Sequence, residues 1–196
     1  MKPVLLLLAG YLLGSLPFAV LVSRALRLAD PRTYGSGNPG ATNVLRSGSR
    51  LAAALTLAGD AGKGALAVWL GRSLGDGSAA LAIGCGASAF LGHVFPLFLR
   101  FHGGKGVATF LGVLLAYEPW LGLCCCGLWL AAALASRYAS LASLTAAAAA
   151  PVLVALVDGV DAPLAVVAAM AAVLAWRHRA NIAKLRAGTE SRIGAR

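Results

Sequence analysis

The chain of 196 residues is 59% hydrophobic and only 12% charged, with a mean hydropathy of +0.79 and a formal net charge of +10. Soluble domains carry about twice that fraction of charged residues, so the composition indicates one integral membrane domain over residues 1–196. The positive charge does not indicate nucleic-acid binding, because too little of the chain is polar to form such a surface. Excess Lys and Arg in a membrane protein more often reflects its orientation.

Long runs with few or no charges predict an all-α integral membrane protein with seven transmembrane helices. In chain order they cover residues 3–23, 51–71, 77–99, 106–117, 119–136, 138–157 and 162–176. The run 106–117 is the weakest, because its 12 residues at about 1.5 Å rise give roughly 18 Å, less than a bilayer core. A tilted or re-entrant segment is the alternative there.

Basic residues are distributed unevenly between the two sides that seven spans define. One side holds 14 of the 17 Lys and Arg residues, in the segments 24–50, 100–105, 137 and 177–196. The opposite side holds four of the seven acids: Asp76, Glu118, Asp158 and Asp161. Because Lys and Arg concentrate in cytoplasmic loops, we expect the N-terminus outside and the C-terminus in the cytoplasm.

A polar, glycine-dense segment follows the first span: Gly35-Ser36-Gly37-Asn38-Pro39-Gly40-Ala41-Thr42-Asn43-Val44-Leu45-Arg46. Gly and Asn tolerate positive φ angles and let successive backbone N–H groups converge on an anion. The alternative is an ordinary loop in which Ser, Thr and Asn cap helices. Similar segments at 102–106 and 177–181, on the same predicted side, favour a shared phosphate site.

Two Gly-Lys-Gly sequences occur in the chain, one around Lys63 and one around Lys105. Lys63 lies in the second predicted span three residues after Asp60, so the two charges can neutralise each other on one helix face. The sequence leaves open whether they form a structural ion pair or whether Lys63 faces the same cavity as the loops. Lys105 precedes an apolar helix whose N-terminus favours an anion. It is not part of a Walker A motif, because no Ser or Thr follows it.

The basic tail carries His178 and Asn181 three residues apart, which places both on one face of a helix leaving the last span. Attraction of the tail to anionic lipid is the alternative. The four cysteines, Cys85 and Cys124-Cys125-Cys126, lie in apolar runs. We expect them to be small buried side chains without disulfides, and we expect no metal site.

Several common catalytic patterns are missing from the sequence. There is no Gly-x-Ser-x-Gly nucleophile elbow and no His-x-x-x-x-Asp pair. An anion site at a membrane surface suits anion transport, binding of a lipid headgroup, or a transfer reaction on a phosphorylated lipid-like substrate. Because the polar residues concentrate on one side, chemistry at the surface is favoured over a non-enzymatic transporter of anions or phospholipids.

Five segments, in chain order, resemble the motifs of the bacterial acyl-phosphate-dependent glycerol-3-phosphate acyltransferases, the PlsY family. They are the segment 35–46, Asp60-Ala61-Gly62-Lys63-Gly64, Gly92-His93-Val94-Phe95-Pro96, Gly103-Gly104-Lys105-Gly106-Val107-Ala108-Thr109 and Arg177-His178-Arg179-Ala180-Asn181-Ile182. The resemblance implies a multi-pass protein of the bacterial inner membrane with its active site facing the cytoplasm. It implies transfer of a fatty acyl group from acyl phosphate to the 1-hydroxyl of glycerol 3-phosphate, the first acylation of phospholipid biosynthesis, without a cofactor. The products are lysophosphatidic acid and phosphate, and the soluble enzyme that makes acyl phosphate is a possible partner.

On this hypothesis the segments supply two groups of site residues. The expected catalytic residues are Ser36, Arg46, Lys105, His178 and Asn181. The expected ligands of substrate phosphate are Gly35, Gly37, Asn38, Thr42, Asn43, Lys63, Gly103, Gly104 and Gly106. Acyl phosphate is already activated, so the reaction needs no protein nucleophile, in keeping with the missing elbow.

Overall fold

The computed structural model describes residues 1–157, 159 and 161–194, and these contain helices and no strand. Asp158 and the last two residues of the basic tail lie outside them. The α-helices are α1 (Lys2–Gly14), α2 (Phe18–Ala25), α3 (Ala41–Val44), α4 (Arg50–Leu74), α5 (Ala79–Val94), α6 (Val107–Tyr117), α7 (Pro119–Ser136), α8 (Ala139–Val157), α9 (Ala162–Arg177) and α10 (Arg179–Arg186). Two short 3-10 helices are η1 (Leu45–Ser47) and η2 (Leu97–Leu99).

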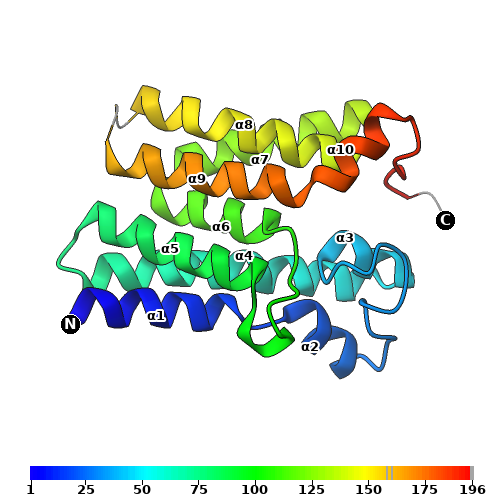
Figure 1. The fold of residues 1–196 in the computed structure, drawn as a ribbon, viewed down its shortest axis with the longest axis horizontal. Coiled ribbons are helices and arrows are strands. Elements are labelled where there is room, and N and C mark those ends of the chain that lie inside the picture. Colours follow the sequence, from blue (N-terminus) through cyan, green and yellow to red (C-terminus); the bar gives the residue numbers. More distant parts are fainter. Residues whose placement is uncertain (158, 160, 195–196) are drawn as a thin grey trace.

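The long helices form two packed groups (Figure 1). Helices α1, α4, α5 and α6 form one group, and α7, α8 and α9 form the other. Contacts of α6 with α7 and of α5 with α9 join them. Their shared core includes Phe90 and Phe110, whose rings meet edge to face with centroids 6.2 Å apart. All four cysteines are free, but only Cys85 and Cys125 are buried as predicted, whereas Cys124 and Cys126 are half-buried because adjacent residues point in different directions around α7.

Glycines bring α1 and α5 into direct backbone contact. A Cβ on Gly14 would overlap the backbone of Ala89, and one on Gly92 would overlap the carbonyl of Tyr11. Small residues at a helix interface allow such close approach, which is a common way for helices to associate in membranes.

The first predicted span, 3–23, is not one continuous helix. Helices α1 and α2 meet at an angle of 42° across Ser15, Leu16 and Pro17. The break has a clear cause, because proline lacks the N–H that an α-helix needs and its ring clashes with the preceding turn. It leaves the Leu16 carbonyl free to accept a hydrogen bond from Lys63 Nζ at 2.8 Å.

Four segments are long and apolar enough to cross a membrane: Arg50–Leu74, Ala79–Leu99, Pro119–Ser136 and Ala139–Val157. The bent pair α1 and α2 makes up to five. Helix α6 has 11 residues and α9 has 16, giving lengths of about 16 and 24 Å. The number seven therefore stays a prediction.

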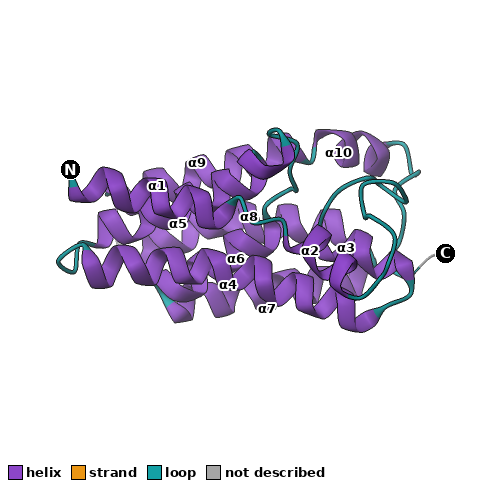
Figure 2. Cartoon of the chain, turned by 90° about the horizontal axis from the view of Figure 1, so that it is seen from below, coloured by secondary structure: helices purple, strands orange, loops and turns teal. Residues whose placement is uncertain are grey.

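The loops sort to opposite ends of the bundle (Figures 1 and 2). At the end that carries the N-terminus, Lys2 Nζ forms a salt bridge of 3.1 Å with Asp76 in the α4–α5 turn. At the other end lie α2, α3 and α10, with the tail bound to the α7–α8 turn through an Ile193 N–H bond to the Arg137 carbonyl at 2.7 Å. The described parts of all four basic segments thus lie toward this end of the molecule, with 100–105 nearer the middle of the bundle (Figure 1).

Candidate active site

A cavity of about 540 Å³ lies among the loops at this basic end. Three stretches far apart in the sequence line it: the α2–α3 loop, the loop before α6, and the region from the end of α9 into α10. The lining residues are Arg32, Gly35, Ser36, Gly37, Asn38, Pro39, Phe101, His102, Gly103, Lys105, Arg177, Ala180, Asn181 and Lys184. The three polar segments singled out in the sequence therefore meet around one space.

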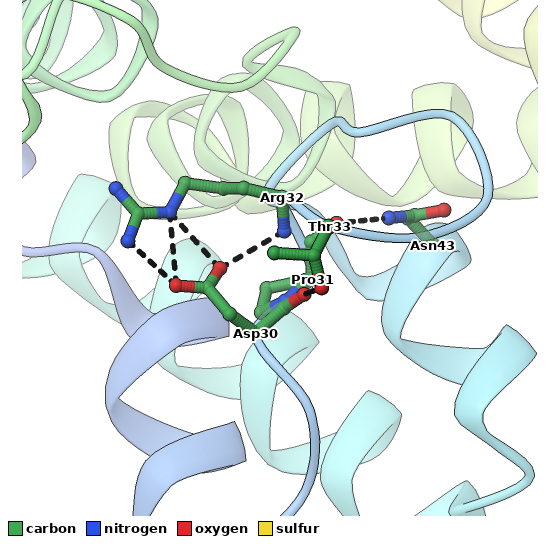
Figure 3. A network of polar contacts seen from close by, with 5 residues as sticks. All are labelled: Asp30, Pro31, Arg32, Thr33 and Asn43. Atoms are coloured by element: carbon green, nitrogen blue, oxygen red, sulfur yellow. Dashed lines mark hydrogen bonds and ion pairs between the residues drawn. The ribbon is translucent and has the colours of Figure 1, made fainter.

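Asn43 on α3 organises the first loop (Figure 3). Its buried side chain donates from Nδ2 to the carbonyls of Pro31 (2.6 Å) and Tyr34 (3.2 Å), and its Oδ1 accepts from the Ser36 N–H at 3.0 Å. Gly35 has a φ of +60° and lies so close to Asn43 that a Cβ would overlap its Oδ1. Asn43 therefore shapes the loop that presents Ser36 to the cavity and does not itself line it.

Arg32 brings positive charge to the cavity from the same loop. Its guanidinium forms a salt bridge with the Asp30 carboxylate, with Nη2 at 2.6 Å from Oδ2 (Figure 3). The hydrogen bonds from Arg32 hold the pKa of Asp30 below its usual value, although burial opposes this shift. A phosphate that reaches Arg32 must share it with this carboxylate.

The second loop is fixed from both sides by hydrogen bonds to its backbone groups. The Gly104 N–H donates to the His93 carbonyl at 3.1 Å. From the opposite side, Arg177 donates to the carbonyls of Gly103 (2.8 Å) and Gly104 (3.3 Å). A Cβ on Gly103 would overlap the His93 carbonyl, and one on Gly104 would overlap the His93 ring. Both positions therefore require glycine.

Lys105 connects this loop to the tail. Its Nζ donates to Asn181 Oδ1 at 2.6 Å, and Asn181 Nδ2 donates to Glu190 Oε1 at 2.7 Å. The same carboxylate oxygen accepts from Ser140 Oγ on α8 at 2.7 Å. Burial lowers the pKa of Lys105 to about 8; Glu190 opposes the shift, while the neighbouring cations Arg177, Arg46 and Lys184 reinforce it. The lysine is thus a partly buried cation with one side-chain acceptor among the residues that the structure describes.

His178 is buried at the junction of α9 and α10 and is not among the residues that line the cavity. Its Nδ1 lies 2.8 Å from the Leu174 carbonyl, which only accepts, so Nδ1 carries the proton. Burial lowers the pKa of the ring to about 4; the Leu174 bond opposes this, and the charge of Lys105 reinforces it. At neutral pH the ring is therefore neutral, and Nε2 is the nitrogen that can accept a hydrogen bond.

Arg46 is held at the edge of the site by the tail. Its Nη2 lies 2.6 Å from Ser191 Oγ, and its side chain lies beside Gly35. Arg46 does not line the cavity as the structure stands, and neither do Thr42, Gly104 and Gly106. Gly106 instead precedes α6 with a φ of +87°, packed against the Phe90 ring.

Lys63 is buried within helix α4 and is not part of the loops that line the cavity. Its Nζ lies 2.8 Å from Asp60 Oδ1, and both side chains are nearly fully buried. Of the two alternatives that the sequence left open, the structure shows the ion pair, and Lys63 does not line the 540 Å³ cavity. The expectation that Lys63 binds substrate phosphate therefore has no support from this geometry, because its amine is already bonded to Asp60 and the Leu16 carbonyl.

Some lining residues were not among the expected catalytic residues or phosphate ligands, although His102 and Arg177 lie in segments predicted to form the site. Arg177, Lys184, Arg32, Phe101 and His102 all line the cavity. Arg177 directly precedes His178 in a predicted motif, so its position was a usable signal, but its bonds to the glycine loop depend on tertiary structure. Among the described residues, no group of three or more His, Cys, Asp or Glu side chains is placed to hold a metal ion.

Comparison with known proteins gives one consistent result. The family model described as glycerol-3-phosphate acyltransferase matches residues 4–188. The glycerol-3-phosphate acyltransferase of Laribacter hongkongensis is 56% identical over 191 residues, covering 96% of this chain and 94% of that protein. The enzyme of the same name from Ralstonia pickettii is 57% identical over 198 residues, covering 97% and 94%.

Solved structures agree with the sequence relatives. The fold matches crystal structures of PlsY (YgiH), an integral membrane glycerol 3-phosphate acyltransferase, at 36% identity over 99% of this chain and 96% of that chain. The TM-score is 0.93 for its glycerol 3-phosphate form and 0.90 for its lysophosphatidic acid form. The chain belongs to the glycerol-3-phosphate acyltransferase family of integral membrane proteins, the PlsY family.

Proposed function

We propose that the chain transfers a fatty acyl group from acyl phosphate to the 1-hydroxyl of glycerol 3-phosphate, giving lysophosphatidic acid and phosphate. The observation that carries this proposal is the charge around the cavity. Arg32, Lys105, Arg177 and Lys184 all line it, and each substrate carries a phosphate with a charge of about −1.5 to −2 near neutral pH. Four cations in one space match two phosphates better than one.

The chemistry fits a site without a protein nucleophile. The glycerol 3-phosphate hydroxyl oxygen attacks the acyl carbon, the carbon–oxygen bond to phosphate breaks, and the phosphate leaves. The proton of the attacking hydroxyl passes to a phosphate oxygen, so no protein base has to accept it. Lys105 and Arg46 hold phosphate charge, with Arg46 turning from Ser191 into the cavity when substrate binds.

Three further residues orient the reacting groups by hydrogen bonds. Ser36 is presented by the Asn43-organised loop, and Asn181 already bonds Lys105. Neutral His178 does not line the cavity as the structure stands, so a local rearrangement on substrate binding has to bring its acceptor nitrogen to a substrate hydroxyl. The loop residues that line the cavity, Gly35, Gly37, Asn38 and Gly103, surround the phosphates with backbone N–H groups and short side chains, while Thr42 stays outside the lining. A donor aimed at the oxyanion of the tetrahedral intermediate contributes about 2.7–4 kcal/mol.

We further propose that the protein crosses the bacterial inner membrane seven times, with its N-terminus outside and the cavity facing the cytoplasm. The gathering of the four basic segments at one end of the bundle supports this orientation. A cytoplasmic site is open to glycerol 3-phosphate and to acyl phosphate delivered by the soluble enzyme that makes it.

The donor is tested with purified protein in detergent or vesicles. Palmitoyl phosphate and glycerol 3-phosphate should give equimolar phosphate and lysophosphatidic acid. The thioesters palmitoyl coenzyme A and palmitoyl acyl carrier protein should not give lysophosphatidic acid when they replace palmitoyl phosphate. Transfer from either thioester at a rate equal to that from palmitoyl phosphate would refute the donor assignment. A non-enzymatic transporter would form no lysophosphatidic acid with any donor.

A further inference from the structure

A buried group of charged side chains lies directly beneath the site loops without lining the main cavity. Asp60 Oδ1 on α4 lies 2.8 Å from Lys63 Nζ and 3.3 Å from His93 Nδ1 on α5. All three side chains are at most 7% exposed. Each charge placed in a membrane span costs about 2.5–3.5 kcal/mol on insertion scales, so their presence requires an explanation.

Stability alone does not explain them. Replacing a buried ion pair by apolar side chains of similar size is often neutral or stabilising. Helices α1, α4 and α5 also already pack through glycine and alanine backbones. What the charged group adds is a set of directed contacts to segments that helix packing does not reach.

These contacts lead to the loops of the active site. Lys63 holds the Leu16 carbonyl at the α1–α2 break, and His93 holds Gly104 through its carbonyl and the edge of its ring. A small cavity of about 10 Å³ lies between the group and the loops, and its lining includes Pro39 of the first loop together with Gly103 and Gly104 of the second. The charged group therefore contacts the second loop directly through His93, and it faces Pro39 of the first loop across this small cavity.

We propose that Asp60, Lys63 and His93 form a buried positioning network that holds the glycine loop carrying Lys105 in its phosphate-binding geometry. This inference rests on the proposed function, because it takes the loop 103–106 as a phosphate site. Asp60 fixes the rotamer of the His93 ring, the ring and carbonyl of His93 fix Gly104, and Gly104 places the following Lys105. The three residues do not touch substrate.

The test uses the purified double variant Asp60→Asn/Lys63→Met, which removes both charges together and leaves neither one buried without a partner. We expect the KM for glycerol 3-phosphate to rise about 10- to 100-fold, because a misplaced binding group weakens substrate positioning. The matched control is Arg72→Met, on the same helix α4 at the opposite end, where Arg72 Nη2 donates to the Tyr117 carbonyl at 2.6 Å. That variant should keep its KM within about threefold even if it is less stable.

A wild-type KM in the double variant would overturn the inference, whatever its thermal stability. If the double variant does not insert, His93→Asn takes its place. In this variant the Asn amide takes the place of Nδ1 facing Asp60, but the ring edge beside Gly104 is lost. The KM for glycerol 3-phosphate should therefore rise again. An unchanged KM would overturn the inference. If Lys105→Ala is inactive while these variants keep a wild-type KM, only the positioning network fails. If Lys105→Ala is fully active, the site assignment itself fails.

Discussion

The two Gly-Lys-Gly sequences of this chain have different structural roles. Gly62-Lys63-Gly64 lies within helix α4, where Lys63 is buried and paired with Asp60 one helical turn earlier. Gly104-Lys105-Gly106 forms a loop before α6, where Lys105 lines the cavity and bonds Asn181. The tripeptide does not determine the role of its lysine; the role depends on whether a local acid is available and whether the backbone is helical.

The largest effect is expected from Lys105→Ala. Removing this cation should lower kcat/KM by about 10³-fold, equivalent to roughly 4 kcal/mol, because it takes away a preorganised charge at the transferring phosphate. Lys184→Ala is the matched control, since Lys184 lines the same cavity but is exposed, and it should lose less than about tenfold. Both variants should insert into the membrane normally. Equal losses of kcat/KM for the two variants would contradict a special role of Lys105.

Gly104→Ala should have the next largest effect. A Cβ at this position overlaps the His93 ring, so the loop must shift and carry Lys105 with it. We expect kcat/KM to fall about 10- to 100-fold in steady-state assays with glycerol 3-phosphate varied. Full activity would show that the loop tolerates displacement.

Asn181→Ala removes the only acceptor that the structure shows for Lys105 Nζ among the described residues. Lys105 then loses its orientation, and kcat/KM should fall about tenfold or more. Ser140→Ala is the control, because Ser140 bonds the same Glu190 oxygen from α8 without touching Lys105. It should stay within about threefold of wild type, and a loss as large as that of Asn181→Ala would instead implicate Glu190.

The pH profile tests the role of the Lys105 cation further. With the pKa of Lys105 lowered to about 8, the cation is present below that pH and is lost above it. The kcat/KM reports the free enzyme, so it should fall about tenfold per pH unit well above pH 8. In Lys105→Arg the cation persists, and this alkaline decline should disappear even if the overall rate is lower. If kcat/KM of Lys105→Arg still declined above pH 8, the decline would come from the titration of another group.

Gly62→Ala should have the smallest effect. No atom lies within 4 Å of a Cβ built at Gly62, which is on the exposed face of α4. The variant should keep wild-type activity and gain about 0.5–1 kcal/mol of stability, seen as a higher thermal midpoint. Reduced activity would show that the exposed face of α4 takes part in function.

Much of the fold could be predicted from the sequence because hydrophobic runs and charge counts are local signals. The runs 119–136 and 138–157 match α7 and α8 closely, and the basic segments lie at one end of the bundle as the charge count required. The break at Pro17 was missed, although proline was a usable signal. The role of Lys63 stayed open because Asp60 is compatible with both alternatives, and only the folded structure, in which buried Lys63 pairs with Asp60 away from the 540 Å³ cavity, distinguishes them.

The site was predictable to the same extent as the fold: local sequence signals identified some residues, and tertiary contacts determined the rest. Glycine-rich segments with basic residues identified Ser36, Lys105 and Asn181, which meet around the cavity. The contacts of Arg177 with the glycine loop and of Ser191 with Arg46 join residues 73 or more positions apart. No local pattern encodes such pairs, so they could be found only in the folded chain.

The central claim is that three distant segments form one phosphate site at the basic end of the bundle. A structure of this protein with glycerol 3-phosphate bound tests it most directly. The account predicts the phosphate inside the 540 Å³ cavity, in hydrogen-bond contact with Lys105 and with backbone N–H groups of the glycine loops. A phosphate bound at the opposite end, beside Lys2 and Arg72, or one that makes no contact with Lys105, would contradict it.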